Sequence, residues 1–223
     1  VNYSTVLATK LKRLSDVQSI PLDPVPTDGS EASLQGRAAV LGIFELPCGA
    51  ALKVYGTHLT HLNFSTGADG ERRKQAEALL QHESLVQLPS PTLVVGDFNQ
   101  PRCPDLLPEE WKIVASTQVA RNEPEDDGVH SAFLDFGFVC SLDMSAAGSN
   151  WPKGSPPPPS HWTGTAIDYS FAKHLALHGH YVVPVCMSDH LPVVSDWEIL
   201  RESDAKMAKV SPKVMAASKS RSR

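Results

Sequence analysis

Short apolar runs, rich in β-branched and aromatic residues, recur along this chain and are separated by turn-forming residues. Two of them, RAAVLGIFEL (37–46) and ALKVYGTHL (51–59), flank a Pro-Cys-Gly-Ala turn and predict an antiparallel hairpin. Residues 71–87 carry apolar side chains at helical spacing and predict a helix. The run TLVVGDF (92–98) is typical of a fully buried strand. Strands that alternate with a helix indicate a layered α/β fold.

The rest of the chain gives weaker signals. Three further runs predict strands, at 166–172, 181–186 and 191–200. Residues 5–22 fit either a pair of strands or a helix. The periodicity weakens over 101–160, where HSAFLDFGFV suggests a helix or a strand. The histidines of 174–180 fall between two expected strands, so we interpret them as solvated turn residues.

Charge is unevenly distributed along the 223 residues. The formal net charge is −5, but residues 201–223 carry seven basic and two acidic side chains, so residues 1–200 carry −10. Residues 1–200 are predicted to form one domain, and residues 201–223, which lack any apolar period, a basic flexible tail. A domain with this much negative charge has little non-specific affinity for polyanions, unless a metal ion or a local basic patch contributes positive charge.

The four cysteines have no metal-binding or redox spacing. Cys48, Cys103, Cys140 and Cys186 are separated by 55, 37 and 46 residues, and no CxxC pair occurs. Their mostly apolar neighbours indicate buried thiols of a reducing compartment, which favours an intracellular location, although two disulfides would also be possible. No run of 18 apolar residues predicts a membrane-spanning helix.

Four of the expected strands meet polar, potentially ligating residues at one end. The four motifs are GTHL (56–59), GDFN (96–99), AIDY (166–169) and SDH (188–190). A carboxylate at the end of a buried strand is held rigidly, and oxygen ligands of this kind suit Mg²⁺. An asparagine amide can donate to a phosphoryl oxygen, and histidine exchanges protons near neutral pH. The set indicates metal-assisted hydrolysis of a phosphoester.

Each motif alone also has a purely structural interpretation. GDFN is a common tight turn, because Asp and Asn side chains bond to nearby backbone groups. Asp168 could pair on the surface, and His58 and His190 could be hydrogen-bonded core histidines. The occurrence of all four motifs in this order favours the catalytic interpretation.

The ordered set VYGTHL, VVGDFNQ, TAIDYSFA and SDHLPVVSDW resembles the endonuclease/exonuclease/phosphatase superfamily. Its members include apurinic endonucleases, deoxyribonucleases, neutral sphingomyelinases, inositol polyphosphate phosphatases and deadenylases. The resemblance covers about residues 5–200. It implies a four-layer α/β sandwich, in which two mixed sheets pack together with helices outside, and a site that uses Mg²⁺ or, alternatively, Mn²⁺.

The same resemblance implies that the domain is N-terminally incomplete in this chain. The family begins with a strand that ends in Asn, a helix, and a strand that leads to a Gln-Glu pair whose Glu is a principal metal ligand. No segment here matches them. Residues 5–22 resemble the strand pair that follows in the family.

The resemblance also implies residue roles around a metal ion. Asp97 would orient or deprotonate the attacking water and lie at the metal, and Asn99 would hold the scissile phosphate. Asp189 would be a further metal ligand.

Three more residues take family roles at the phosphate. His190 would contact the phosphate and form an Asp–His pair with Asp168, which fixes the imidazole tautomer. His58 resembles the histidine that several branches use beside the phosphate. The arginines at 72–73 are interpreted as structural, and the His-Trp pair at 161–162 either lines the mouth of the site or packs against its own loop.

The predicted function is metal-dependent hydrolysis of a phosphoester by a phosphodiesterase, nuclease or phosphatase. The substrate would be a nucleic acid, a phospholipid or a small phosphate ester. The alternative is a catalytically inactive or truncated family member that acts as a binding module, since no segment matches the metal-binding Glu.

Overall fold

The structure, a computed structural model, describes residues 7–22, 37–61, 70–86, 88–121, 123–143, 155–185 and 187–200. The strands are β1 (Lys12–Arg13), β2 (Gln18–Pro21), β3 (Ala38–Glu45), β4 (Ala51–His58), β5 (Thr92–Asp97), β6 (Val139–Cys140), β7 (Asp168–Lys173), β8 (Leu175–Val182) and β9 (Val193–Ile199). The helices are α1 (Glu71–Leu85), α2 (Pro108–Ala120) and α3 (Val129–Asp135), with a short 3₁₀ turn at Cys103–Asp105.

Seven of these strands form one mixed sheet. Its order is β1-β3-β4-β5-β7-β6, and β2 pairs with β3 beside β1. The pair β4–β5 is parallel because α1 connects the two strands, while the other pairs are antiparallel. The predicted hairpin is therefore confirmed as β3–β4. Residues 7–22 provide two strands and no helix.

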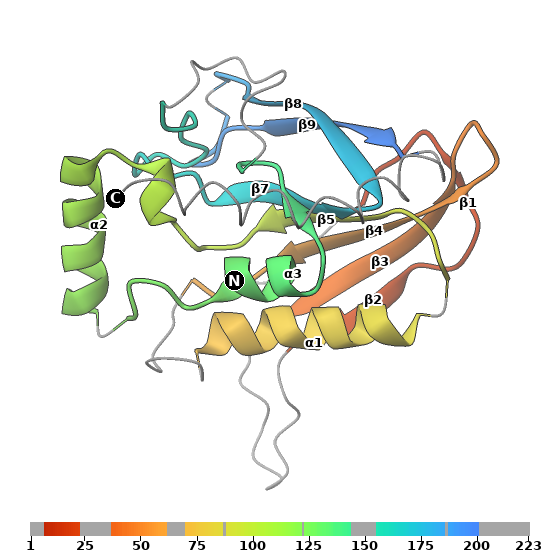
Figure 1. The fold of residues 1–223 in the computed structure, drawn as a ribbon, viewed down its shortest axis with the longest axis horizontal. Helices are drawn as coiled ribbons and strands as arrows, with labels where there is room; N and C mark the ends of the chain where they lie inside the picture. The colour runs from red at the N-terminus through yellow and green to blue at the C-terminus, as the bar shows by residue number, and fades with distance from the viewer. Residues whose placement is uncertain are drawn as a thin grey trace, which may run out of the picture.

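Helices α1 and α3 cover one face of this sheet, and β8 and β9 lie on the opposite side (Figure 1). Successive side chains of a strand point to opposite faces of the sheet. On β5, Thr92 and Val94 are buried, while Leu93 and Val95, which point to the other face, are half-buried. Aromatic rings fill the centre of this layer, where Phe133 stacks on Phe171 with ring centroids 4.1 Å apart.

The second sheet consists, among the described residues, of the antiparallel pair β8–β9. It is joined to the large sheet by a hydrogen bond between the hydroxyls of Ser170 on β7 and Ser195 on β9, 3.0 Å apart. A mixed sheet, a second sheet and helices confirm the predicted α/β class. Of the four layers that the resemblance implies, the described residues show three, which run from helices through the large sheet to β8–β9.

Three sequence expectations about local structure need correction. The interpretation of the histidines of 174–180 as solvated turn residues holds for His174, which is exposed between β7 and β8, but His178 and His180 lie on β8, and His180 is only 1% exposed. The helix predicted over 71–87 ends at Leu85. Helix α2 was not predicted, because its apolar residues do not form one face of a helix, and several of them, such as Ile113, are exposed.

The cysteine prediction is partly wrong. Cys140 is buried as expected, but Cys48 and Cys103 are exposed, and all three are free thiols. Cys186 and the predicted tail at 201–223 lie outside the described residues. Within the described ranges, no helix combines the length and the apolar character needed to cross a membrane.

Candidate active site

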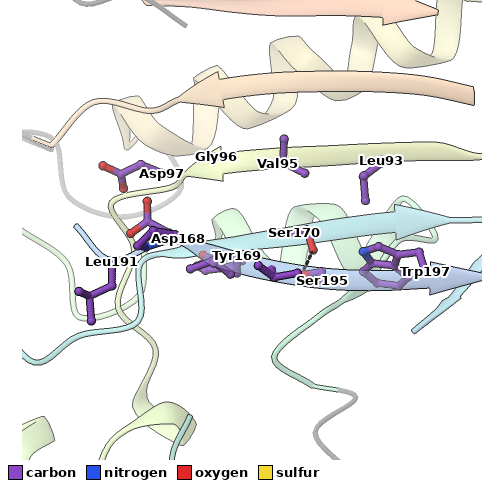
Figure 2. A pocket seen from close by; sticks show the side chains of 13 residues that line it. Leu93, Val95, Gly96, Asp97, Asp168, Tyr169, Ser170, Leu191, Ser195 and Trp197 are labelled. Carbon is purple, nitrogen blue, oxygen red and sulfur yellow. Dashed lines mark hydrogen bonds between the residues drawn. The ribbon is translucent and has the colours of Figure 1, made fainter. Parts of the chain in front are cut away.

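Strand register brings three of the predicted residues to one edge of the large sheet. His58 at the end of β4 is the register partner of Asp97 at the end of β5. Asp97 is in turn the register partner of Asp168 at the beginning of β7, because β7 runs antiparallel to β5. Figure 2 shows the carboxylates of Asp97 and Asp168 next to each other at this edge.

Local hydrogen bonds within the GDFN segment fix Asp97. Gly96 has a φ of +152°, and a Cβ at this position would lie 1.9 Å from the carbonyl oxygen of Thr57 on the neighbouring strand. Asn99 adopts a φ of +50°, which asparagine tolerates better than most residues. Its N–H donates to Asp97 Oδ1 at 2.8 Å, and its Nδ2 donates to the Leu59 carbonyl at 3.0 Å and to Asp97 Oδ2 at 3.2 Å. The local side-chain-to-backbone bond that the structural interpretation expects is present at the same residues as the functional interpretation, although the segment carries no assigned turn.

His190 approaches the two carboxylates from the segment before β9. Its Nδ1 lies 2.7 Å from Asp168 Oδ2, and its Nε2 lies 3.8 Å from Asp97 Oδ2. Ser160, which sequence reasoning missed, donates its hydroxyl to the same Asp168 oxygen at 2.8 Å. The Ser160 oxygen also accepts the N–H groups of Ile167 and Asp168, each at 3.0 Å. Asp168 is thus oriented from two sides.

Burial and charge shift the proton equilibria at this edge. Burial, followed by the neighbouring charge of Asp168, raises the pKa of Asp97 to about 7 against the opposing effect of the Asn99 N–H. Burial lowers the pKa of His190, but the hydrogen bond and charge of Asp168 outweigh it, so this pKa lies above its usual value. A carboxyl group whose pKa is raised to about 7 and an imidazole whose pKa is also raised therefore face each other.

His58 is a neutral neighbour of Asp97. Its Nε2 lies 3.3 Å from Asp97 Oδ2. Burial, followed by the positive charges of Arg37 and His190, lowers the pKa of His58 to about 4. Arg37 is a second residue that sequence reasoning missed: it is 6% exposed and immediately precedes β3, which places its charge beside the end of β4. In the sequence, the only feature that could have pointed to Arg37 is its position directly before an apolar strand.

Asp189 belongs to a different group of donor atoms from Asp97. One group contains Asp97, Asp168 and His190, and another contains His161, Asp189 and His190; within each group the donor atoms lie within 4.8 Å of one another. The Asp189 carboxylate accepts the Ser188 hydroxyl at 2.8 Å, a bond that lowers its pKa. The role of Asp189 as a metal ligand remains a prediction.

The facing carboxylates suit a hard divalent cation. Asp97 and Asp168 offer oxygen donors, which Mg²⁺ and Mn²⁺ prefer. Their mutual repulsion, which raises the pKa of Asp97, would be relieved by a cation between them. The donor set therefore fits the ion that the sequence predicts.

A cavity of about 550 Å³ begins at these carboxylates and runs between the large sheet and β9. Asp97 and Asp168 lie at one end of it and Trp197 at the other (Figure 2). Its walls are mostly apolar, with Leu93 and Val95 on the side of β5.

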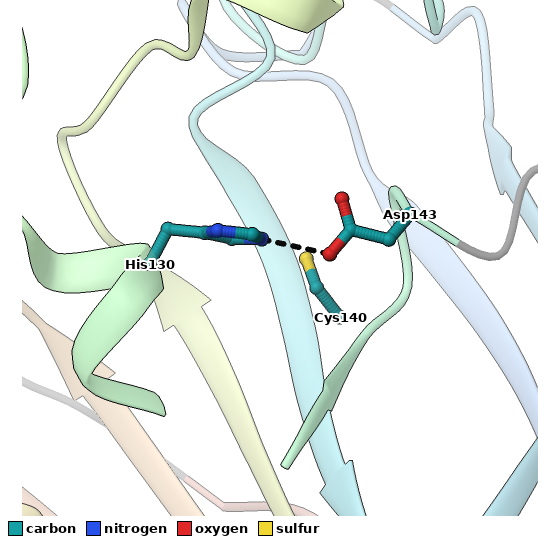
Figure 3. Close-up of side chains that lie close together, drawn as sticks. All are labelled: His130, Cys140 and Asp143. Atoms are coloured by element: carbon teal, nitrogen blue, oxygen red, sulfur yellow. Dashed lines mark hydrogen bonds and ion pairs between the residues drawn. The ribbon is translucent and has the colours of Figure 1, made fainter. Parts of the chain in front are cut away.

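A third group of donor atoms lies elsewhere and is occupied by an arginine. Figure 3 shows His130 and Asp143 joined beside Cys140. The Arg102 guanidinium lies among them, with Nη1 2.8 Å from Asp143 Oδ1 and 3.8 Å from Cys140 Sγ, and it also binds Asp105 through two nitrogens. Burial raises the pKa of Cys140 to about 12, so the sulfur keeps its proton. The group is an ion-pair network that fixes the chain just after Asn99.

The arginines of α1 have the structural role expected from the sequence. Arg72 is 1% exposed and forms ion pairs with Asp127 and Glu123. Arg73 pairs with Glu77 one turn along the same helix.

A two-sheet α/β fold with a carboxylate–histidine edge defines the class of protein. Residues 15–190 match the Endonuclease/Exonuclease/phosphatase family, and the chain belongs to that family. No curated protein sequence matches the chain.

Solved structures share this fold at low sequence identity. An endonuclease/exonuclease/phosphatase from Bacteroides vulgatus is 16% identical, has a TM-score of 0.61, and is matched over 86% of this chain and 67% of its own. The Bacteroides thetaiotaomicron mannosyl-6-phosphatase is 17% identical, with a TM-score of 0.57 over 85% of this chain and 68% of its own. ANGEL2, a 2′,3′-cyclic phosphatase, is 15% identical, with a TM-score of 0.52 over 84% of this chain and 67% of its own.

Proposed function

We propose that this protein hydrolyses a phosphoester bond with the help of a bound divalent metal ion, Mg²⁺ or Mn²⁺. The observation that carries the proposal is the convergence of His58, Asp97, Asp168 and His190 at one sheet edge. Relatives with this fold include a mannosyl-6-phosphatase and a 2′,3′-cyclic phosphatase, so phosphoester chemistry on different substrates is compatible with the fold.

Asp97 and Asp189 are the residues that we propose as metal ligands, and Asp168 is close enough to Asp97 to share the ion's charge. When bound, the metal would neutralise negative charge on the phosphoryl oxygens. Asp97 would also orient the attacking water through a carboxylate oxygen.

Asn99 would hold the scissile phosphate. One Nδ2 hydrogen is already fixed on the Leu59 carbonyl. The other donates to Asp97 at 3.2 Å, a long bond that substrate binding can exchange for a bond to a phosphoryl oxygen. The left-handed backbone at Asn99 keeps the amide at the edge of the site.

His190 would bind the phosphate as an imidazolium. Asp168 occupies Nδ1, so Nε2 is the atom available toward Asp97 and the substrate. The raised pKa of His190 favours the charged form, which binds and protonates phosphate oxygens. His58, with its lowered pKa, would contribute a neutral imidazole on the other side of Asp97.

We also propose that residues 1–200 act as one domain and that the basic segment 201–223 is dispensable for its folding. Limited proteolysis that leaves a stable product ending near residue 200 would support this division, whereas cleavage within 37–61 at the same rate would contradict it.

Turnover of a panel of phosphomonoesters and phosphodiesters tests the proposal. The full chain is assayed with Mg²⁺, with Mn²⁺ and with EDTA. We expect hydrolysis with either ion, its loss in EDTA, and its loss in Asp97→Ala and His190→Ala. The matched control is His178→Ala, which removes a surface histidine paired with Glu198. Metal-supported binding of phosphoesters without turnover would instead favour a binding module and overturn the hydrolase proposal.

A further inference from the structure

Trp162 projects into solvent from a segment whose backbone is firmly held. Its side chain is 76% exposed, although large aromatic residues are usually well buried. The backbone N–H of Trp162 donates to the Asp189 carbonyl at 2.9 Å, and the backbone N–H of His161 donates to the Thr165 carbonyl at 3.1 Å. The expectation that this tryptophan packs against its own loop is therefore wrong. A fixed turn presents an exposed indole.

The indole lies at the mouth of the proposed active site. His161 forms a β-bridge with His190, and the centroids of their rings are 4.6 Å apart. The centroid of the Trp162 ring is 5.9 Å from that of the His161 ring. The rings of His190, His161 and Trp162 thus follow one another at these distances, so a group attached to a phosphate at His190 can reach the indole.

We propose that Trp162 binds a nucleobase by stacking, and that the substrate is a nucleotide-type phosphoester with its base close to the scissile phosphate. This inference rests on the proposed function, because it assumes that phosphate binds at His190. Stacking needs only the π-face of the base and works without positive charge. It therefore suits a site in a body that carries −10 over residues 1–200.

The same charge favours a mononucleotide or a short strand over a long polyanion. An extended nucleic acid would require a basic surface to neutralise its phosphates. Trp162 offers one stacking position, and the neighbouring His161 ring is tilted by 54° against the indole. We therefore expect one base to be bound and the binding to depend weakly on salt.

Calorimetric binding in EDTA tests the inference without turnover. The ligands are adenosine 5′-monophosphate, which carries a base, and glycerol 3-phosphate, which does not. We expect Trp162→Ala to weaken binding of the nucleotide about tenfold or more, and Trp162→Phe to retain most of it. Binding of glycerol 3-phosphate should change less than twofold. The melting temperature should not fall, because the side chain is exposed.

Met187→Ala is the matched control, since Met187 is an apolar side chain, 89% exposed, two residues before Asp189. It should leave the affinity for both ligands unchanged. Equal loss of both ligands in Trp162→Ala, or no loss of nucleotide affinity, overturns the inference, as does failure of the wild-type chain to bind the nucleotide.

A lipid surface is the rival outcome. If the wild-type chain binds phosphatidylcholine vesicles and both Trp162→Ala and Met187→Ala abolish this binding while nucleotide affinity is unchanged, Trp162 is a membrane contact and stacking is overturned. Failure of the hydrolase proposal is seen separately, as absence of turnover in a chain that still binds the nucleotide through Trp162.

Discussion

His190 Nδ1 lies 2.7 Å from Asp168 Oδ2, although 22 positions separate the two residues in the sequence. The Ser160 hydroxyl donates to the same carboxylate oxygen and helps to hold it in place. The imidazole is consequently oriented with Nε2 toward Asp97. This pair connects the AIDY and SDH motifs, which the sequence presents as separate features.

Asp168→Asn should reduce turnover by roughly 10²–10⁴-fold while the fold is kept. The substitution preserves shape but removes the charge that raises the pKa of His190, so this pKa should fall. The measurements are kcat as a function of pH and an NMR titration of the His190 ring. His178→Ala should leave kcat within a factor of two. A value of kcat within tenfold of wild type in Asp168→Asn would show that the pair has no catalytic role.

Asp97 should make the metal-free protein less stable as pH rises. Its folded pKa of about 7 lies above the ordinary value of 3.8, so the folded state binds more protons than the unfolded state between these values. The contribution of Asp97 to the free energy of unfolding is therefore fully present below about pH 4 and is lost toward pH 7, a change of up to a few kcal/mol.

Denaturant unfolding in EDTA across this pH range measures the effect. Asp97→Asn should flatten the dependence and raise stability at pH 7, while abolishing turnover. Asp196→Asn removes an exposed carboxylate on β9 and should leave the slope unchanged. The same slope in Asp97→Asn as in wild type would refute the assignment.

Gly96→Ala should destabilise the protein by on the order of 3 kcal/mol or more. The new Cβ would meet the Thr57 carbonyl at 1.9 Å, and the two strands would have to separate beside Asp97. Gly49→Ala is the control, because Gly49 also has a positive φ (+83°) but no atom within 4 Å of the added Cβ. It should cost no more than about 1–2 kcal/mol. Similar losses for both variants, measured by urea unfolding, would mean that close strand contact is unimportant.

Arg72→Met should cost about 3–5 kcal/mol, since it leaves the buried carboxylates of Asp127 and Glu123 without their cation. The adjacent Arg73→Met should cost less than about 0.5 kcal/mol, because its partner Glu77 is half-exposed on the same helix. Chemical denaturation of the two variants makes the comparison. Equal costs would contradict a structural role specific to Arg72.

The motifs could be found from the sequence because strand ends leave a local signature. An apolar run followed by Asp, Asn or His identified Asp97, Asn99 and His58 without any tertiary information. Ser160 and Arg37 had no such signature. Each acts on a site residue from another segment, and a lone serine or arginine before a strand occurs in many structural contexts.

The sequence by itself determined the strands β3, β4, β5, β7 and β9, the first helix and the residue types that meet at strand ends. It could do so because apolar periodicity and turn chemistry act over a few neighbouring positions. Only the tertiary structure decided which side chains share a proton or a charge. The pairing of β4 with β5 and of β5 with β7 sets the distances among His58, Asp97 and Asp168. Desolvation then shifts the pKa of Asp97, and burial of that kind depends on layers contributed by distant segments.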